Sequence, residues 1–152
     1  MSYPNIKPQA LALCEQWTKE RREAIQKKEA NLQEALLGAS KSSAGDKHNT
    51  ERAMLQIERE QLGNQLAVLK RDQEILDRID PESTGNIVHL GSLVYTASAV
   101  YFISVSAGIF SVSNRQIIAL SSVTPIGQQL VGKSVGDSFS WQGVNNKILA
   151  IY

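Results

Sequence analysis

The sequence lacks most of the features that mark the common classes of secreted, metal-binding or nucleic-acid-binding protein. It has one cysteine, Cys14, among 152 residues, so it can form neither an intramolecular disulfide nor a Cys₄ or Cys₂His₂ zinc site. The net charge is only +1, which gives no field to attract nucleic acid or an anionic membrane. Residues 1–10 lack the apolar run of a signal peptide. These absences predict a cytoplasmic protein that binds neither membranes nor DNA by itself.

Motifs of independent catalysis are also missing. The sequence contains no phosphate-binding glycine loop, no nucleophile elbow and no zinc-hydrolase pattern. Its two histidines, His48 and His89, are far apart, and neither has a Cys or His at ligand spacing. We therefore expect no enzyme with an active site of its own.

Charge is distributed very unevenly along the chain. Residues 1–80 hold 13 Lys and Arg and 13 Asp and Glu, whereas residues 81–152 hold 3 and 2. Pro81 cannot continue a helix, and 82–86 is rich in turn-forming residues. The sequence therefore predicts two domains, 1–80 and 81–152.

The second part of the charged region has a heptad pattern. One track of leucines repeats every seven residues: Leu55, Leu62, Leu69 and Leu76. An adjoining apolar track widens it and consists of Met54, Val68 and Ile75. This broad stripe predicts a coiled-coil helix over roughly 47–80. A weaker track of Leu11, Thr18, Ile25 and Leu32 predicts a helix over roughly 8–37.

The break between these helices consists of small residues. Residues 38–46 include two glycines and three serines, which favours an antiparallel hairpin with its tip near 40–49. The alternative is a parallel dimeric coiled coil in which the glycines form a flexible break.

The region after Pro81 has the texture of β-structure. The uncharged window from Leu93 to Val112 is long enough to span a bilayer, but its recurring Ser and Thr among β-branched and aromatic residues favour strands. We expect strands near 87–90, 93–97, 99–106, 109–112, 116–121, 135–141 and 147–152, and a short helix at 125–131. The fold class is therefore α+β, with a helical hairpin followed by a mainly antiparallel sheet.

The segment Thr124-Pro125-Ile126-Gly127-Gln128-Gln129-Leu130-Val131-Gly132-Lys133-Ser134-Val135-Gly136-Asp137 resembles the C-terminal signature of GreA/GreB-type transcription elongation factors. The segment 88–94 also resembles the start of that FKBP-like domain, and Gly45-Asp46 stands at the hairpin tip as a Gly-Asp pair does in the family. The resemblance covers nearly the whole chain in architecture, but only 124–137 is close in residues.

This resemblance implies a partner and a mode of action. The globular domain would dock on bacterial RNA polymerase, and the finger would enter the secondary channel. The factor would then be a monomer and would contact nucleic acid only within the transcription complex. In cleavage-active members, acidic tip residues help to hold a Mg²⁺ shared with the polymerase, which suits the preference of that ion for carboxylate oxygens.

The tip departs from the family pattern. The family places a second acidic residue three positions after the Asp, where this chain has Asn49. The candidate tip carboxylates are therefore Asp46 and, with a different local register, Glu51. An Asp at a helix start equally fits a favourable interaction with the helix dipole, with Ser43 as a cap.

The docking segment differs at one position. The family commonly has an Asp two residues before the proline, where this chain has Val123. The matching residues, Thr124, Pro125, Ile126 and Gly127, are the candidate polymerase-binding residues. Packing of a helix N-terminus on the sheet also accounts for Ile126.

Three functions remain open from the sequence. The first is a polymerase-binding regulator of pausing and backtracking, and the second is a factor that stimulates RNA cleavage by the polymerase. The third is a coiled-coil adaptor with an FKBP-like domain and a different protein partner.

Overall fold

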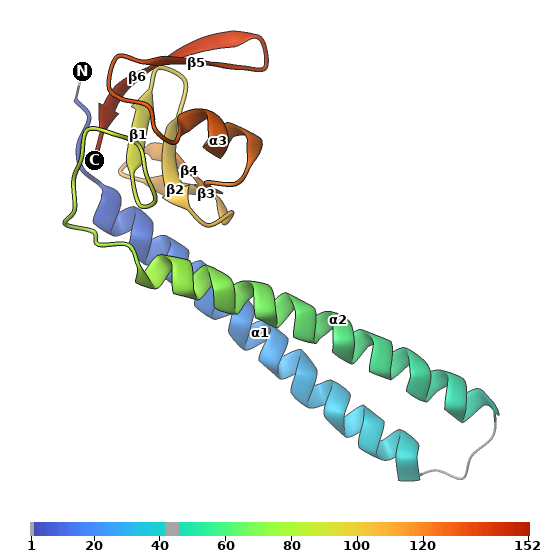
Figure 1. Ribbon diagram of the computed structural model, residues 1–152. Coiled ribbons are helices and arrows are strands. Elements are labelled where there is room, and N and C mark those ends of the chain that lie inside the picture. The colour runs from blue at the N-terminus through green and yellow to red at the C-terminus, as the bar shows by residue number, and fades with distance from the viewer. Residues whose placement is uncertain (1, 42–45) are drawn as a thin grey trace. The chain divides into compact units, whose positions relative to one another are not determined.

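The computed structural model describes residues 2–41 and 46–152, and the side chains of 39–41 and 46–48 lie outside that description. Two long helices precede six strands that form one sheet, and a short helix follows the fourth strand in the sequence (Figure 1). The elements are α1 (Lys7–Lys41), α2 (Asp46–Asp77), β1 (Leu93–Thr96), β2 (Val100–Ser104), β3 (Gly108–Val112), β4 (Arg115–Ser121), α3 (Pro125–Leu130), β5 (Ser138–Trp141) and β6 (Val144–Ile151). The predicted α+β class is confirmed.

Contacts divide the chain into two compact units. The sheet unit comprises Met1–Trp17 and Gln73–Tyr152, and the hairpin unit comprises Thr18–Asp72. Helices α1 and α2 each contribute to both units. The division into domains 1–80 and 81–152 stays a prediction, because contact clustering does not test which segments fold independently.

The sheet has the strand order β3-β4-β2-β1-β6-β5. Strands β2 and β4 are parallel, and the other neighbouring pairs are antiparallel. The expected strand at 87–90 is wrong, because this segment forms only an isolated bridge between Ile87 and Ser134. Strand β6 begins at Val144, earlier than expected, because the turn before it consists of Gln142 and Gly143, both with positive φ.

Both faces of the central strands β1 and β2 are buried. Side chains alternate between two cores along each central strand, as Tyr101 and Phe102 do. The first core joins Phe102 and Ile117 to the first turns of α1 and the end of α2. The second joins Tyr101 and Ile148 to Leu130 of α3, which lies over that face (Figure 1). Double burial explains why β1 and β2 read as continuous apolar runs.

The hairpin unit is held by one seam of side chains. Leu32 of α1 and Leu62 of α2 line the same hollow between the helices. A step of seven residues in opposite directions places Ile25 beside Leu69, and these four residues are all buried. The seam confirms the predicted antiparallel hairpin, whose helices lie side by side in Figure 1.

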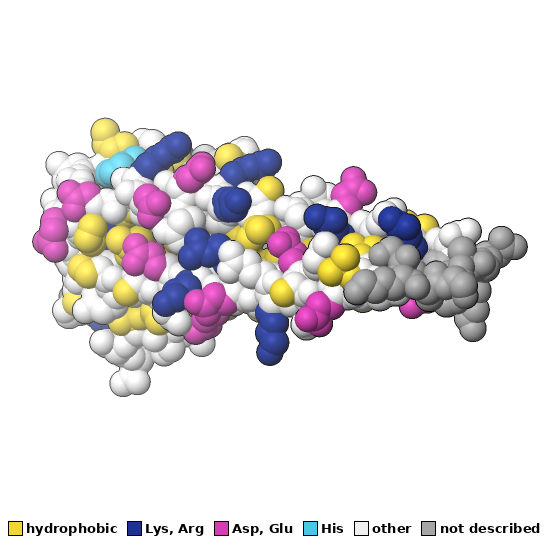
Figure 2. All heavy atoms as spheres, turned by 90° about the horizontal axis from the view of Figure 1, so that it is seen from below, with side chains coloured by type: hydrophobic (Ala, Val, Ile, Leu, Met, Phe, Trp, Pro, Cys, Tyr) yellow, Lys and Arg dark blue, Asp and Glu magenta, His cyan; other side chains and the backbone are white. Residues whose placement is uncertain are grey.

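The adjoining apolar track of α2 is outside this seam. Met54 is 66% exposed and Val68 is 52% exposed, so the broad stripe expected from the sequence is only partly buried. A helix with a single partner covers one narrow arc, and the second track lies beyond that arc. Figure 2 shows one face of the protein, on which apolar side chains lie between charged ones.

Candidate docking surface and hairpin tip

The Thr124–Gly127 segment forms the N-terminus of α3. Thr124 has extended backbone angles, and its Oγ1 accepts a hydrogen bond from the Gly127 amide at 3.2 Å. The same hydroxyl donates to the Ser121 carbonyl at 2.6 Å. Pro125 occupies the first turn, where its missing N–H costs no hydrogen bond. Thr124 and Pro125 are thus explained as a helix cap and a helix start.

Residue 127 must be a glycine because there is no space for a side chain. A Cβ at this position would lie 2.3 Å from the Ser121 carbonyl oxygen and 2.9 Å from Thr124 Oγ1. No side chain fits there without movement of the backbone. The glycine of the Thr-Pro-Ile-Gly pattern therefore serves close packing of the turn, whatever else the turn binds.

The four predicted polymerase-binding residues differ in accessibility. Pro125 is exposed, Thr124 and Ile126 are half-buried, and Gly127 is buried. Val123, which precedes the cap, is 74% exposed. The Gln128 amide donates to the Val123 carbonyl at 2.9 Å and holds this corner in place. A partner can reach Val123 and Pro125 directly, and Gln128 is an exposed residue of this corner that the sequence did not predict.

The rest of the signature is a structural turn. Asp137 Oδ2 accepts from the Ser134 amide at 2.8 Å, and the Asp137 carbonyl accepts from the Ile148 amide. Gly132 and Gly136 have φ of 87° and 91°, which favours glycine. These contacts tie the segment after α3 to β6, so most of the 124–137 pattern encodes the fold.

At the tip, Asp46 is the first residue of α2, and its side chain lies outside the described residues, as do Ser43 and Gly45. Asn49 follows on the same face of the helix, whereas Glu51, five residues on, lies about 140° around the axis. Glu51 is exposed and lines a hollow on α2 with Met54, Leu55 and Glu58. The metal and cleavage roles of Asp46 and Glu51 stay predictions.

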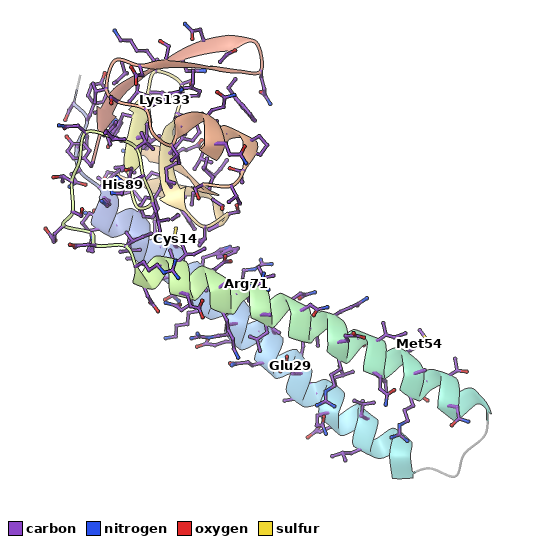
Figure 3. All side chains as sticks on the ribbon, in the orientation of Figure 1. Cys14, Glu29, Met54, Arg71, His89 and Lys133 are labelled. Carbon is purple, nitrogen blue, oxygen red and sulfur yellow. The ribbon has the colours of Figure 1, made fainter. Side chains whose placement is uncertain are left out.

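Among the described side chains, no group of three or more His, Cys, Asp or Glu is placed to hold a metal ion. Two buried reactive groups lie in the sheet unit. Burial lowers the pKa of Lys7, against the effect of nearby Asp80, and its Nζ donates to the Ser83 carbonyl at 2.6 Å. Burial raises the pKa of the Cys14 thiol to about 11, and its Sγ lies 3.8 Å from Ser104 Oγ. Both side chains are buried in the sheet unit, and Cys14 is labelled on α1 in Figure 3.

Over the described part of the chain, no helix is both long and apolar enough to cross a membrane.

Comparisons with known proteins found structural matches only. No family model and no curated protein matches the sequence. The crystal structure of the GreA factor homolog 1 (Gfh1) protein of Thermus thermophilus matches at 19% identity and a TM-score of 0.35, over 89% of this chain and 92% of that one. A structure of the transcription factor Gfh1 matches at 19% identity and a TM-score of 0.35, over 93% and 92%. The chain is thus similar to a GreA factor homologue, and residues 124–137 resemble the same family.

Proposed function

We propose that this protein is an accessory factor of bacterial RNA polymerase. In this proposal the sheet unit docks on the polymerase through the corner at Val123 and Pro125. The hairpin enters the secondary channel and modulates pausing and backtracking. The factor acts as a monomer and has no active site of its own, and it meets nucleic acid only within the transcription complex.

The observation that carries the proposal is the presence of two features in one chain. One is a helical hairpin built on a single seam, whose helices contain 35 and 32 residues and extend about 50 Å at 1.5 Å per residue. The other is the capped turn at Thr124–Gly127, in a segment that resembles the docking signature of GreA/GreB-type factors. A hairpin is narrow enough to enter a channel, and a separate rigid unit can hold it there.

The residues at the tip set the expected activity. The Gly-Asp pair keeps one carboxylate, Asp46, but Lys47 and His48 follow it and Asn49 replaces the second acid. Mg²⁺ is held by several oxygen ligands, so a single carboxylate binds it only together with ligands from the polymerase. We therefore propose a regulator that occupies the channel. If the protein does stimulate cleavage, Asp46 is the residue through which it would do so.

The test is a purified, backtracked bacterial elongation complex in Mg²⁺ buffer, titrated with the protein. Shortening of the RNA 3′ end and co-migration with the polymerase are measured together. Binding without cleavage supports the channel-occupying regulator. Cleavage that rises with the wild-type protein and is lost in Asp46→Ala, with binding retained, makes it a cleavage factor. If the protein neither co-migrates nor causes cleavage, the proposal is wrong.

The docking corner has a sharper test in Val123→Asp. This substitution restores the acid that the family commonly carries, at an exposed position where it need not disturb the fold. We expect tighter co-migration with the polymerase. Val144→Asp is the matched control, because Val144 is also exposed, at 58%, and belongs to β6, outside the 123–127 segment. An equal effect of both variants would contradict docking through this corner.

A second candidate function, a coiled-coil adaptor, is favoured by the uncovered apolar track. Met54, Ile57 and Val68 are each more than half exposed on α2, and apolar patches of this kind mark protein interfaces. An adaptor would bind a protein other than polymerase through this track. Loss of that binding in Met54→Glu, with polymerase co-migration absent in the wild type, would favour the adaptor.

A further inference from the structure

The sheet unit contains a cavity that the proposed function does not use. Its volume is about 330 Å³, near the lower end of the range for small-molecule sites. The cavity lies where the β1–β2 turn, the start of β4 and the N-terminal segment meet, and its walls are formed by Tyr3, Tyr95–Val100, Arg115, Gln116, Ile118 and Leu149. The lining is mixed, with apolar side chains beside the polar Thr96, Ser98, Arg115 and Gln116.

Among the described residues that line the cavity, Arg115 is the charged one. Its guanidinium carbon lies 5.6 Å from the centre of the Tyr95 ring, within the range of a cation–π contact. One of its nitrogens, Nη2, donates to the Ser2 carbonyl at 2.7 Å. These two contacts orient the guanidinium beside Tyr95 and the N-terminal segment.

Within residues 2–41 and 46–152, no carboxylate is paired with Arg115. The sequence after Pro81 contains only two acidic residues, Glu82 and Asp137, and Asp137 accepts from the Ser134 amide in a different turn. A guanidinium has five N–H donors, and one of them is used by Ser2. Among the described residues, the cavity therefore has a cation with free donors and no acidic side chain in its lining.

The N-terminal segment that completes the cavity is held firmly. Tyr152 Oη donates to the Tyr3 carbonyl at 2.5 Å, and Tyr95 Oη donates to the Pro4 carbonyl. The rings of Tyr3 and Tyr95 pack with centroids 5.3 Å apart. Together with the Ser2 contact of Arg115, three successive carbonyls are bound by side chains of the sheet. These contacts hold Tyr3 in place as one wall of the cavity.

We propose that this cavity binds a small carboxylate with a short apolar or aromatic body. The carboxylate pairs with the free edge of Arg115, in the forked geometry that guanidinium groups form with carboxylates. The body lies against Tyr3, Tyr95 and Leu149. A single cation suits a singly charged ligand, whereas a phosphate or nucleotide would bring more charge than the cavity balances.

A carboxylate of this kind could belong to a free organic acid or to the C-terminus of a peptide. The probes are 3-phenylpropionate, the peptide Gly-Ser-Gly-Ser-Phe with a free C-terminus, and the same peptide as its C-terminal amide. Binding to the full-length protein is followed by calorimetry and by amide chemical shifts. A free acid that binds alone identifies a metabolite site, and a peptide acid that binds better than its amide identifies a C-terminus site.

Variants test the role of the charge. We expect Arg115→Met to weaken binding of the preferred carboxylate at least tenfold and Arg115→Lys to weaken it less. Lys147→Met removes an exposed cation elsewhere on the sheet and should leave binding unchanged. Tyr152→Phe loosens the N-terminal segment without removing the charge, and should weaken binding less than Arg115→Met.

Three results would overturn the proposal. One is the absence of saturable binding of all three probes at millimolar concentration. Another is equal affinity of wild type and Arg115→Met, with unchanged thermal midpoints as the check on folding. The third is equal binding of the neutral alcohol 3-phenylpropanol, because it would show that the cavity does not recognise an anion. None of these outcomes depends on polymerase binding.

Discussion

The two units are stabilised in different ways. The sheet unit buries side chains on both faces of its sheet, in one core under α3 and another under the first turns of α1. The hairpin unit has a single seam, and its remaining surface is charged or uncovered. The sheet unit therefore tolerates little change and positions the candidate docking corner and cavity, whereas the hairpin unit is a repeating structure that tolerates change outside its seam.

The two tryptophans make this difference measurable. Trp17 and Trp141 both belong to the sheet unit, so fluorescence reports on that unit, while far-ultraviolet circular dichroism reports mainly on the two long helices. Denaturation followed by both signals separates the stabilities of the units.

The largest effect is expected from Phe102→Ala in the sheet unit. Phe102 is fully buried in the first core, and removal of a buried phenyl ring costs about 4 kcal/mol. Urea denaturation followed by fluorescence measures the loss in the free energy of unfolding. Phe102→Leu, which keeps most of the volume, should cost less than about 1.5 kcal/mol. Equal losses in the two variants would contradict tight packing in this core.

Gly127→Ala should destabilise the sheet unit by about 3 kcal/mol, at the upper end of overpacking effects. The reason is the 2.3 Å approach of the added Cβ to the Ser121 carbonyl. The same fluorescence measurement applies, and shifted amide resonances around 121–130 should mark the site of strain. A wild-type free energy of unfolding in this variant would show that the turn has room for a side chain.

Leu62→Ala tests the seam of the hairpin. Leu62 is 6% exposed, and we expect a loss of about 2 kcal/mol, the low end for a buried leucine. Hydrogen exchange should accelerate in the hairpin unit and stay unchanged in β1 and β2. Val68→Ala on the uncovered track is the control, with an expected change below about 0.5 kcal/mol. Faster exchange in β1 and β2 would mean that the units unfold together.

Gly63→Ala should act in the opposite direction from Gly127→Ala. Gly63 is exposed within α2, and an added Cβ meets no atom within 4 Å. Alanine is favoured over glycine in a helix by about 1 kcal/mol, so circular dichroism should show a higher thermal midpoint. A lower midpoint would reveal close packing at this position.

The last effect is confined to high pH and concerns Cys14. The thiol pKa is raised from 9.0 to about 11, so its stabilising contribution is complete below pH 9 and is lost as pH rises through 11. The free energy of unfolding should fall less over that range in Cys14→Ala, while Tyr95 and Tyr101, whose pKa values are also raised by burial, contribute to the fall in both proteins. At pH 8 the native thiol should react with a disulfide reagent far more slowly than in urea. Rapid reaction of the native thiol would contradict its burial.

Strong local patterns made much of the fold predictable. The heptad tracks predicted the long helices to within a few residues, and Pro125 and Gly132 bracketed α3. The turn implied between the expected strands 109–112 and 116–121 was also correct: it lies at Ser113 and Asn114, whose positive φ suits a tight hairpin. The turn at Gln142 and Gly143 was placed too late, since glutamine rarely adopts positive φ and gives no signal in the sequence.

The candidate sites were less predictable than the fold. The signature at 124–137 stands out in the sequence, but hydrogen bonds and a steric contact account for Thr124 and Gly127. The exposure of Val123 could not be predicted from the sequence, because it depends on which residues surround Val123 in the folded chain. The cavity at Arg115 had no sequence signal, because its walls come from segments far apart in the chain, such as Tyr3 and Leu149.

The seven-residue seam of the hairpin has a consequence for its length. Removing seven residues from each helix at matched positions, such as around Ile25 and Leu69, would leave every remaining seam layer facing its partner. The hairpin would shorten by about 10 Å without any change in its tip sequence or in the sheet unit. Length is thus adjustable in whole steps, by deletion or duplication, and a series of such proteins would serve as a molecular ruler for the depth of whatever site receives the tip.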